Sequence, residues 1–258
     1  MTTATRLNAC KTNPDDEFYT DIAEVEDMLK PNLDALKGKK ILLPCDCPDS
    51  AFYKYLNQNA PEGSEIRSRY YMDEGNWDMT APMANPYYDW CDVVITNPPF
   101  SLLSKTIYPK IVEAKKLATL MIVPLATVGY KSVAKMIADG NAKVVKTVNH
   151  PYVRPDGSKK SIGTVWLATY GAMDLFKDQR ENLDLISGLL SDNNRITDEG
   201  IVEYPKLKDI NIAQKIDRIA VPISVLAKNY NKIFKLVGMG RLHVNGQQLF
   251  QRAILERI

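Results

Sequence analysis

The chain has few residues of the kinds that bind metal ions or cross membranes. Its 258 residues include four cysteines and two histidines, and no Cys-x-x-Cys pair provides zinc-binding spacing. We therefore expect no metal site, and thiols that are reduced and buried. No apolar run reaches the length of a membrane span, and the start MTTATRLNAC lacks the apolar centre of a signal peptide. These absences predict a cytoplasmic protein without a membrane partner.

The residues that are present have the composition of a soluble globular protein, with 45% hydrophobic and 25% charged residues. We expect it to act as a monomer. The net charge is only +2, but residues 206–258 carry ten Lys and Arg against three Asp and Glu. Such a basic end is typical of a surface that faces a polyanion, and also of an ordinary solvated surface.

Strand and helix patterns alternate along residues 40–146. Apolar runs predict buried strands at KKILLPC, DVVITN, LATLMIVPL, AKVVKTVN and GTVWLATY, and SEIRSRYY is a further candidate. Helical spacing occurs in TDIAEVEDMLKPNL (capped by Thr20 or Asp21), DSAFYKYLNQ (capped by Asp49 or Ser50), SLLSKTIYPKIVEAKK and KSVAKMIADG. The pattern favours an α/β fold, a mostly parallel sheet with helices on both faces. The last residues, IFKLVGMGRLHVNGQQLFQRAILERI, predict two β segments joined by a turn.

The strand DVVITN ends in a stiff corner, Asn97-Pro98-Pro99-Phe100. A residue that precedes proline is held extended, which fixes Asn97 and Pro98, and each proline has a fixed φ. The corner therefore presents two acceptors with little freedom, the Asn97 side-chain oxygen and the Pro98 carbonyl, beside the flat ring of Phe100. Ligands of open α/β sheets bind beyond the carboxyl ends of the strands, where this corner is expected to lie.

Two fixed acceptors beside an aromatic ring suit a planar group that carries an NH₂. The lone pair of such an amine is delocalised, which makes the nitrogen a poor nucleophile. Accepting both hydrogens draws the nitrogen toward a tetrahedral shape and frees the lone pair, while Phe100 holds the ring in place. Taken alone, a Pro-Pro pair after a strand is as consistent with a rigid turn as with catalysis.

Four segments together resemble the EcoRI-type family of adenine-specific DNA methyltransferases, which use S-adenosylmethionine. They are DDEFYT (Asp15–Thr20), CDCPDSAFYKYL (Cys45–Leu56), VVITNPPFSL and VPISVLAKNYNKIFKLVG. They occur in that family's order and run over most of the chain. The resemblance implies a Rossmann-like class I methyltransferase fold. It also implies a modification methylase of the restriction–modification type, which methylates the N6 amine of adenine in double-stranded DNA.

The resemblance also implies roles for individual residues. The catalytic set would be Asn97, Pro98, Pro99 and Phe100. The contacts to S-adenosylmethionine would be Phe18, Tyr19 and Thr20 at its methionine end, Cys45, Asp46 and Ser50 around its amino-acid part and ribose, and Asp73 (or Glu74) at the ribose hydroxyls. Asp46 would accept from the cofactor's ammonium. Core packing of Phe18 and Tyr19 and helix capping by Asp46 are the structural alternatives.

An adenine inside a duplex cannot reach such a corner, so the target base would be flipped out, at a cost of a few kcal/mol. The phosphate contacts would come from Arg154, Lys159 and Lys160 on the basic turn VRPDGSKKSIG, and from Arg241 and other basic residues of the C-terminal end. Without DNA, that turn is expected to be a solvated loop.

We divide the chain into a flexible arm (1–14), an S-adenosylmethionine-dependent core (15–173) and a C-terminal part (174–258) that completes the fold and contacts DNA. Two other functions stay open. One is methylation of RNA or of a protein glutamine, although those relatives more often carry Tyr after the prolines. The other is a DNA-binding relative without activity, because PCDCPDSAF lacks the glycine-rich loop of most such enzymes. The EcoRI-type family also tends to lack that loop.

Overall fold

The computed structural model describes residues 18–69, 86–113, 115–154, 156–180, 217–244 and 247–258. The predicted arm and the candidates Asp73 and Glu74 lie outside these ranges. The chain forms two compact units: the first comprises Met1–Pro124 and Val145–Lys177, and the second comprises Leu125–Val144 and Asp178–Ile258. Within the described residues, no helix is long and apolar enough to cross a membrane.

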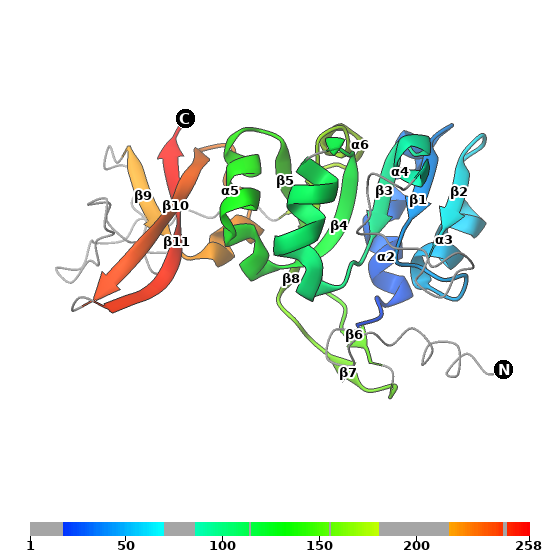
Figure 1. The fold of residues 1–258 in the computed structure, drawn as a ribbon, viewed down its shortest axis with the longest axis horizontal. Helices are drawn as coiled ribbons and strands as arrows, with labels where there is room; N and C mark the ends of the chain where they lie inside the picture. The colour runs from blue at the N-terminus through cyan, green and yellow to red at the C-terminus, as the bar shows by residue number, and fades with distance from the viewer. Residues whose placement is uncertain (1–17, 70–85, 114, 155, 181–216, 245–246) are drawn as a thin grey trace. The chain divides into compact units, whose positions relative to one another are not determined.

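A six-stranded sheet has the order β2-β1-β3-β4-β8-β5 (Figure 1). Its strands are β1 (Lys40–Leu43), β2 (Glu65–Ser68), β3 (Val93–Thr96), β4 (Thr119–Pro124), β5 (Ala142–Thr147) and β8 (Thr164–Thr169). β1 pairs in parallel with β2 and β3, and β3 pairs in parallel with β4, whereas β8 is antiparallel to β4. The predicted α/β fold with a mostly parallel sheet is therefore confirmed, and it is compatible with a Rossmann-like fold.

The first helices begin where polar side chains cap them. Asp21 accepts a hydrogen bond from the Ala23 N–H (3.0 Å) and begins α2 (Ile22–Leu29), which continues as the 3-10 helix η1 (Lys30–Leu36). Ser50 accepts one from the Tyr53 N–H (3.1 Å) and begins α3 (Ala51–Asn59). Of the two caps left open at each helix, the structure selects Asp21 and Ser50.

The described residues form seven further helices. They are α4 (Pro86–Trp90), η3 (Phe100–Leu102), η4 (Leu103–Glu113), η5 (Leu125–Gly129), α5 (Lys131–Ala138), α6 (Ala172–Leu175) and η7 (Ile223–Ala227). The α-helix predicted after Phe100 is instead a 3-10 turn followed by a π-helix that contains Pro109. Proline has no N–H for the i→i−4 ladder, which disfavours regular α-helical winding there. α5 ends at Ala138, and Gly140 follows with a φ of 74°, a conformation in which glycine commonly terminates helices.

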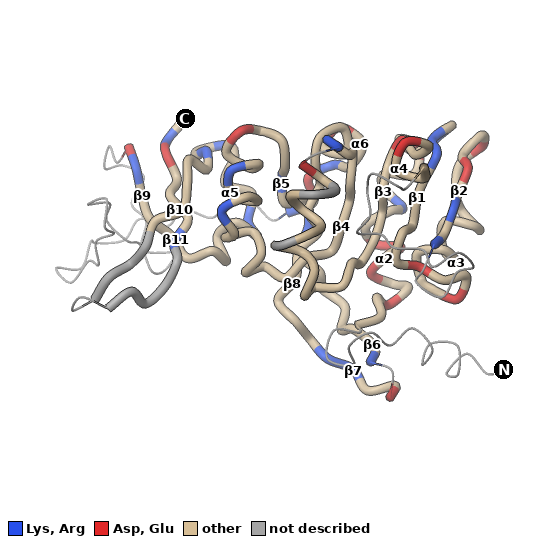
Figure 2. Tube along the Cα trace, in the orientation of Figure 1, with Lys and Arg blue, Asp and Glu red and all other residues tan. Residues whose placement is uncertain are grey.

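The basic turn predicted as a loop is a β-hairpin of two short strands, β6 (Tyr152–Val153) and β7 (Lys159–Lys160). Figure 2 shows β7 in the colour of Lys and Arg, beside the first described residues of the chain. The hairpin was missed because its strands are two residues long, and β7 has no apolar residue to create an alternating pattern.

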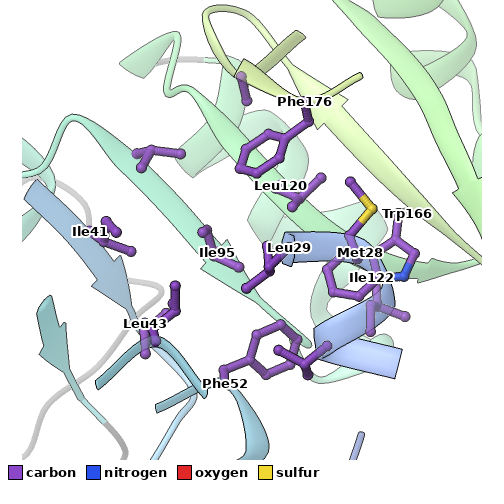
Figure 3. Close-up of a cluster of buried hydrophobic side chains, with 14 of the residues drawn as sticks. Met28, Leu29, Ile41, Leu43, Phe52, Ile95, Leu120, Ile122, Trp166 and Phe176 are labelled. Carbon is purple, nitrogen blue, oxygen red and sulfur yellow. The ribbon is translucent and has the colours of Figure 1, made fainter. Parts of the chain in front are cut away.

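The core of the first unit lies where α2 and α3 cover one face of the sheet (Figure 3). It includes Met28, Leu29 and Phe52 from the helices, and Ile41, Leu43, Ile95, Leu120, Ile122 and Trp166 from the strands. The residues that alternate with these along the strands, Leu42, Val94, Met121 and Leu167, are buried as well. Both faces of the sheet are therefore covered, as an apolar parallel sheet requires.

The second unit contains an antiparallel sheet of order β10-β11-β9, with β9 (Arg218–Val221), β10 (Phe234–Val244) and β11 (Gln247–Arg257). The two β segments predicted at the end of the chain are therefore confirmed. Arg241 lies in β10 opposite Gln251, and its side chain is outside the described part of the structure.

Candidate active site

The sheet of the first unit has a switch point between β1 and β3. The chain passes from β1 outward to β2, and then returns to the other side of β1 as β3. Ligands of open α/β sheets bind in the crevice beyond the carboxyl ends of the strands at such a point. Cys45 and Asp46 follow β1, and Asn97 follows β3 directly. Two of the segments singled out in the sequence therefore meet at this edge.

The Asn97 side chain is held in one orientation. Its Nδ2 donates a hydrogen bond to the backbone carbonyl of Phe18 at 2.7 Å. Only the NH₂ of an amide can donate to a carbonyl, so this contact fixes which way the amide faces. Its Oδ1 is buried and has no hydrogen-bond partner among the described residues. The site thus presents an acceptor that no protein donor occupies.

Phe18, whose carbonyl binds this amide, belongs to a cluster of three aromatic rings. The rings of Phe18 and Phe100 are nearly parallel, with centroids 6.0 Å apart and planes at 21°. Tyr152 meets both rings edge-on, with its centroid 5.9 Å from Phe18 and 6.5 Å from Phe100. One face of Phe100 is therefore packed against Phe18.

The β6–β7 hairpin joins this cluster from a distant part of the chain. Tyr19 and Val153 exchange two backbone hydrogen bonds, each of 2.9 Å. The Arg154 guanidinium lies 5.9 Å from the centre of the Phe18 ring, and the Lys160 ammonium lies 5.4 Å from it. The hairpin therefore brings two of the predicted phosphate contacts to the Phe18 ring, which stacks on Phe100.

The third predicted hairpin contact, Lys159, lies on the same segment. Its ammonium is 3.9 Å from the Asp21 carboxylate, and the lysine side chain is 65% exposed. A pair this open contributes little to stability, so the ammonium remains available to a stronger anion.

The Asp46 carboxyl is buried at the end of β1 with little protein support. The residue is 5% exposed, and its Oδ2 has no hydrogen-bond partner among the described residues. Burial raises the pKa of Asp46 to about 7, and a hydrogen bond with Ser50 offsets part of that effect. The Thr20 hydroxyl is a second buried oxygen without a partner in the described structure. A cationic ligand at this edge could donate hydrogen bonds to these unpartnered oxygens and stabilise the ionised form of Asp46.

Cys45 lines the same edge as a neutral group. Burial raises the pKa of its thiol to about 12, although a hydrogen bond with Thr96 acts in the opposite direction. A thiol that keeps its proton is a poor nucleophile at neutral pH. In the described parts of the chain, no cluster of three or more His, Cys, Asp or Glu is arranged to hold a metal ion.

Sequence reasoning missed a buried carboxylate that supports the site. Glu24 is fully buried; its Oε1 accepts from the Lys146 ammonium and the Trp166 indole, both at 2.7 Å. Its Oε2 accepts from the backbone N–H groups of Asn149 (2.9 Å) and His150 (3.2 Å). The signal was the spacing of Glu24, four residues before Met28 on the buried face of α2.

The structure brings most of the predicted site residues to one edge of the first unit. Ser50 caps α3, five residues after Cys45, and Pro98 is buried. Asp73 is outside the described residues, and Arg241 belongs to the second unit. The result is an α/β protein with a partly unsatisfied polar site at the switch point of its sheet. No protein-family model and no curated protein matches the chain.

Proposed function

We propose that the protein is an S-adenosylmethionine-dependent methyltransferase that acts on the N6 amine of a flipped adenine in double-stranded DNA. The observation that carries the proposal is the Asn97 amide. Its NH₂ group is fixed by Phe18, and its buried oxygen is left as an acceptor at the strand-end Asn-Pro-Pro-Phe corner. An amine that is to be made nucleophilic requires such an acceptor.

The groups beyond β1 suit the cofactor. When bound, S-adenosylmethionine supplies a methyl group made electrophilic by a sulfonium. Asp46 would accept from the ammonium of its amino-acid part, and that positive charge would lower the pKa of the carboxyl again. Thr20 would offer its unpartnered hydroxyl to the same end of the molecule. Cys45, held as a neutral thiol, would line the site without competing for the methyl group.

The corner after β3 would activate the target nitrogen. Asn97 Oδ1 and the Pro98 carbonyl would accept its two hydrogens, which localises the lone pair on nitrogen as positive charge develops there. Neither oxygen is basic enough to keep a proton, so the surplus proton leaves to solvent. Phe18 covers one face of Phe100, so we expect the adenine ring to stack on the opposite face.

The hairpin would hold the backbone next to the flipped base. Arg154, Lys159 and Lys160 lie on one short element beside Phe18, which is itself hydrogen-bonded to Asn97. Phosphate contacts from such residues orient the strand and offset the cost of unstacking. This placement favours a nucleic-acid substrate over a protein one.

The test is transfer of label from methyl-labelled S-adenosylmethionine to duplex DNA. We expect N6-methyldeoxyadenosine after digestion to nucleosides. RNA and a glutamine-containing peptide are the competing acceptors, and label on either one instead of DNA would redirect the assignment. Cofactor that binds in calorimetry without label on any acceptor would refute the proposal. Duplex binding without cofactor binding would indicate an inactive relative.

A further inference from the structure

We propose that the Phe18 backbone carbonyl is the positioning group for Asn97, and that it makes asparagine rather than aspartate the required residue at position 97. This inference rests on the proposed function for its catalytic meaning, but the contact itself is independent of it. The Asn97 amide has two polar atoms, and the structure gives them different tasks. Nδ2 is bound to Phe18, and only Oδ1 is left for a substrate.

The carbonyl is a fixed reference because its segment is anchored on both sides. The next residue, Tyr19, pairs both of its backbone polar groups with Val153. The Phe18 ring packs against Phe100, the last residue of the corner. Two residues after Tyr19, Asp21 caps α2. The backbone bridge, the ring contact and the helix cap together hold this segment in place. The Phe18 carbonyl can therefore orient the Asn97 amide, which has no other described hydrogen-bond partner.

Aspartate at position 97 would remove the donor on which this arrangement depends. A carboxylate of nearly the same shape would put an oxygen about as close to the Phe18 carbonyl as Nδ2 is now. Two acceptors at hydrogen-bond distance repel, and the buried carbonyl would lose its partner. The carboxyl is therefore expected to keep its proton to a higher pH than usual.

Protonation should restore the arrangement. The O–H of a neutral Asp at position 97 can donate to the Phe18 carbonyl, and its second oxygen then points where Asn97 Oδ1 points now. Asn97→Asp should consequently be poorly active at high pH and should recover as the pH falls. A side chain with a merely structural role would not show this recovery in the rate constant.

Asn32 provides a matched control for the same chemical change. It is buried, its Nδ2 donates to the Met28 carbonyl at 2.8 Å, and its Oδ1 accepts from the Lys177 N–H at 3.0 Å. Asn32→Asp therefore also places a carboxyl against a buried carbonyl, but at the end of α2 and away from the corner after β3. It should lose stability as the pH rises while its turnover keeps the pH profile of the wild type.

The experiment measures kcat for wild type, Asn97→Asp and Asn32→Asp between pH 5.5 and 9, with saturating S-adenosylmethionine and duplex. Thermal melting of each protein is measured across the same range. For Asn97→Asp we expect about 10²- to 10³-fold lower kcat than wild type at pH 8.5, the loss typical of one oriented polar group. At pH 5.5 we expect the kcat of Asn97→Asp, divided by that of wild type, to be at least ten times higher than at pH 8.5. The inference would be overturned if the kcat of Asn97→Asp relative to wild type did not change with pH. It would also be overturned if the relative kcat of Asn32→Asp changed with pH to the same extent.

The melting curves separate the two proposals. Should the wild type transfer no methyl group to any acceptor, the proposed function fails, but the contact is still tested. The Asn97→Asp protein should then be destabilised relative to wild type at pH 8.5 and less so at pH 5.5. Equal melting of the two proteins at every pH would show that the Phe18 carbonyl does not hold position 97.

Discussion

The first unit contains two buried polar clusters that differ in how completely they are satisfied. At the start of α2, four protein donors saturate the two oxygens of Glu24. At the carboxyl ends of β1 and β3, buried oxygens of Asp46, Asn97 and Thr20 have no partner among the described residues. Both clusters cost free energy to bury, but only the first recovers it within the protein.

The difference distinguishes structure from function. Buried polar groups of folded proteins are nearly always hydrogen-bonded, and an exception calls for a ligand or another explanation. The Glu24 cluster joins α2 to β5, β8 and the turn before β6, which is a structural task. The unpartnered oxygens lie at the switch point of the sheet, where ligands bind. Substitutions in the two clusters should therefore have opposite profiles, with loss of stability in one and loss of activity in the other.

The largest effect is expected from Glu24→Gln, which leaves the Lys146 ammonium buried without a counter-charge. Breaking a buried pair in this way typically costs about 3–5 kcal/mol. Chemical unfolding of the variant and the wild type measures this loss in the free energy of unfolding. The matched control is Glu26→Gln, because Glu26 pairs with Lys30 at the surface and should lose at most about 1 kcal/mol. Equal losses of stability in Glu24→Gln and Glu26→Gln would show that the Glu24 cluster does not stabilise the fold more than a surface ion pair does.

Asn97→Ala should show the opposite profile. We expect about 10²- to 10³-fold slower methyl transfer, because one oriented acceptor of the developing charge is gone. Cofactor affinity should change by less than about threefold, on the same reasoning that only the target amine meets this oxygen. Single-turnover kinetics and calorimetry measure the two quantities. Asn59→Ala, which removes a comparable amide-to-carbonyl bond at the end of α3, should leave both unchanged.

Asp46→Asn should stabilise the protein without cofactor and weaken cofactor binding. The folded-state pKa of Asp46 is about 7 against an ordinary value of 3.8. The carboxyl therefore favours folding most below pH 4, and this contribution is lost as the pH rises to 7. The variant should gain about 4 kcal/mol at pH 8, at about 1.4 kcal/mol for each unit by which the pKa is raised. It should gain nearly nothing at pH 4, where the carboxyl is neutral and resembles the amide.

The same carboxyl predicts a pH dependence of cofactor binding in the wild type. An ionised Asp46 is needed to pair with an ammonium, so affinity should fall about tenfold per pH unit below pH 7. Asp46→Asn should bind weakly at every pH, with no such slope. Binding that is independent of pH in the wild type would place the ammonium elsewhere.

The smallest effects are expected on the hairpin. Arg154→Gln and Lys160→Gln should each weaken duplex binding by about 1 kcal/mol and reduce the slope of log K against log salt by about 1, as expected for one lost phosphate contact. Fluorescence anisotropy at several salt concentrations measures both. Lys30→Gln, at the far end of α2, should leave the slope unchanged, and an equal change there would indicate a non-specific charge effect.

The sequence predicted those parts of the fold that depend on local patterns. The strands that end at Leu43, Thr96 and Pro124 followed from apolar runs. Capping chemistry limited each of the first two helix starts to two residues, and the structure selects Asp21 and Ser50. Contacts between distant segments could not be read in this way. In α2, the apolar Ile22 is 47% exposed, whereas the acidic Glu24 is fully buried.

The candidate site shows the same division. The stiffness of Asn97 to Phe100 follows from two prolines, so its acceptors were predictable from the sequence. The bond from Asn97 to Phe18 spans 79 positions, and no local pattern encodes it. The hairpin contacts of Arg154 and Lys160 with the Phe18 ring were equally hidden, because they depend on the long-range pairing of Tyr19 with Val153.

The Tyr19–Val153 bridge has a consequence for biosynthesis. The strand that supplies the Phe18 carbonyl is translated early, but its partner leaves the ribosome more than 130 residues later. A nascent chain can therefore contain β1, β2 and β3 while the segment of Phe18 and Tyr19 still lacks its Val153 partner. On the proposed function, we expect methyl transfer only after the hairpin emerges, so a chain whose synthesis stops before Val153 should not modify DNA.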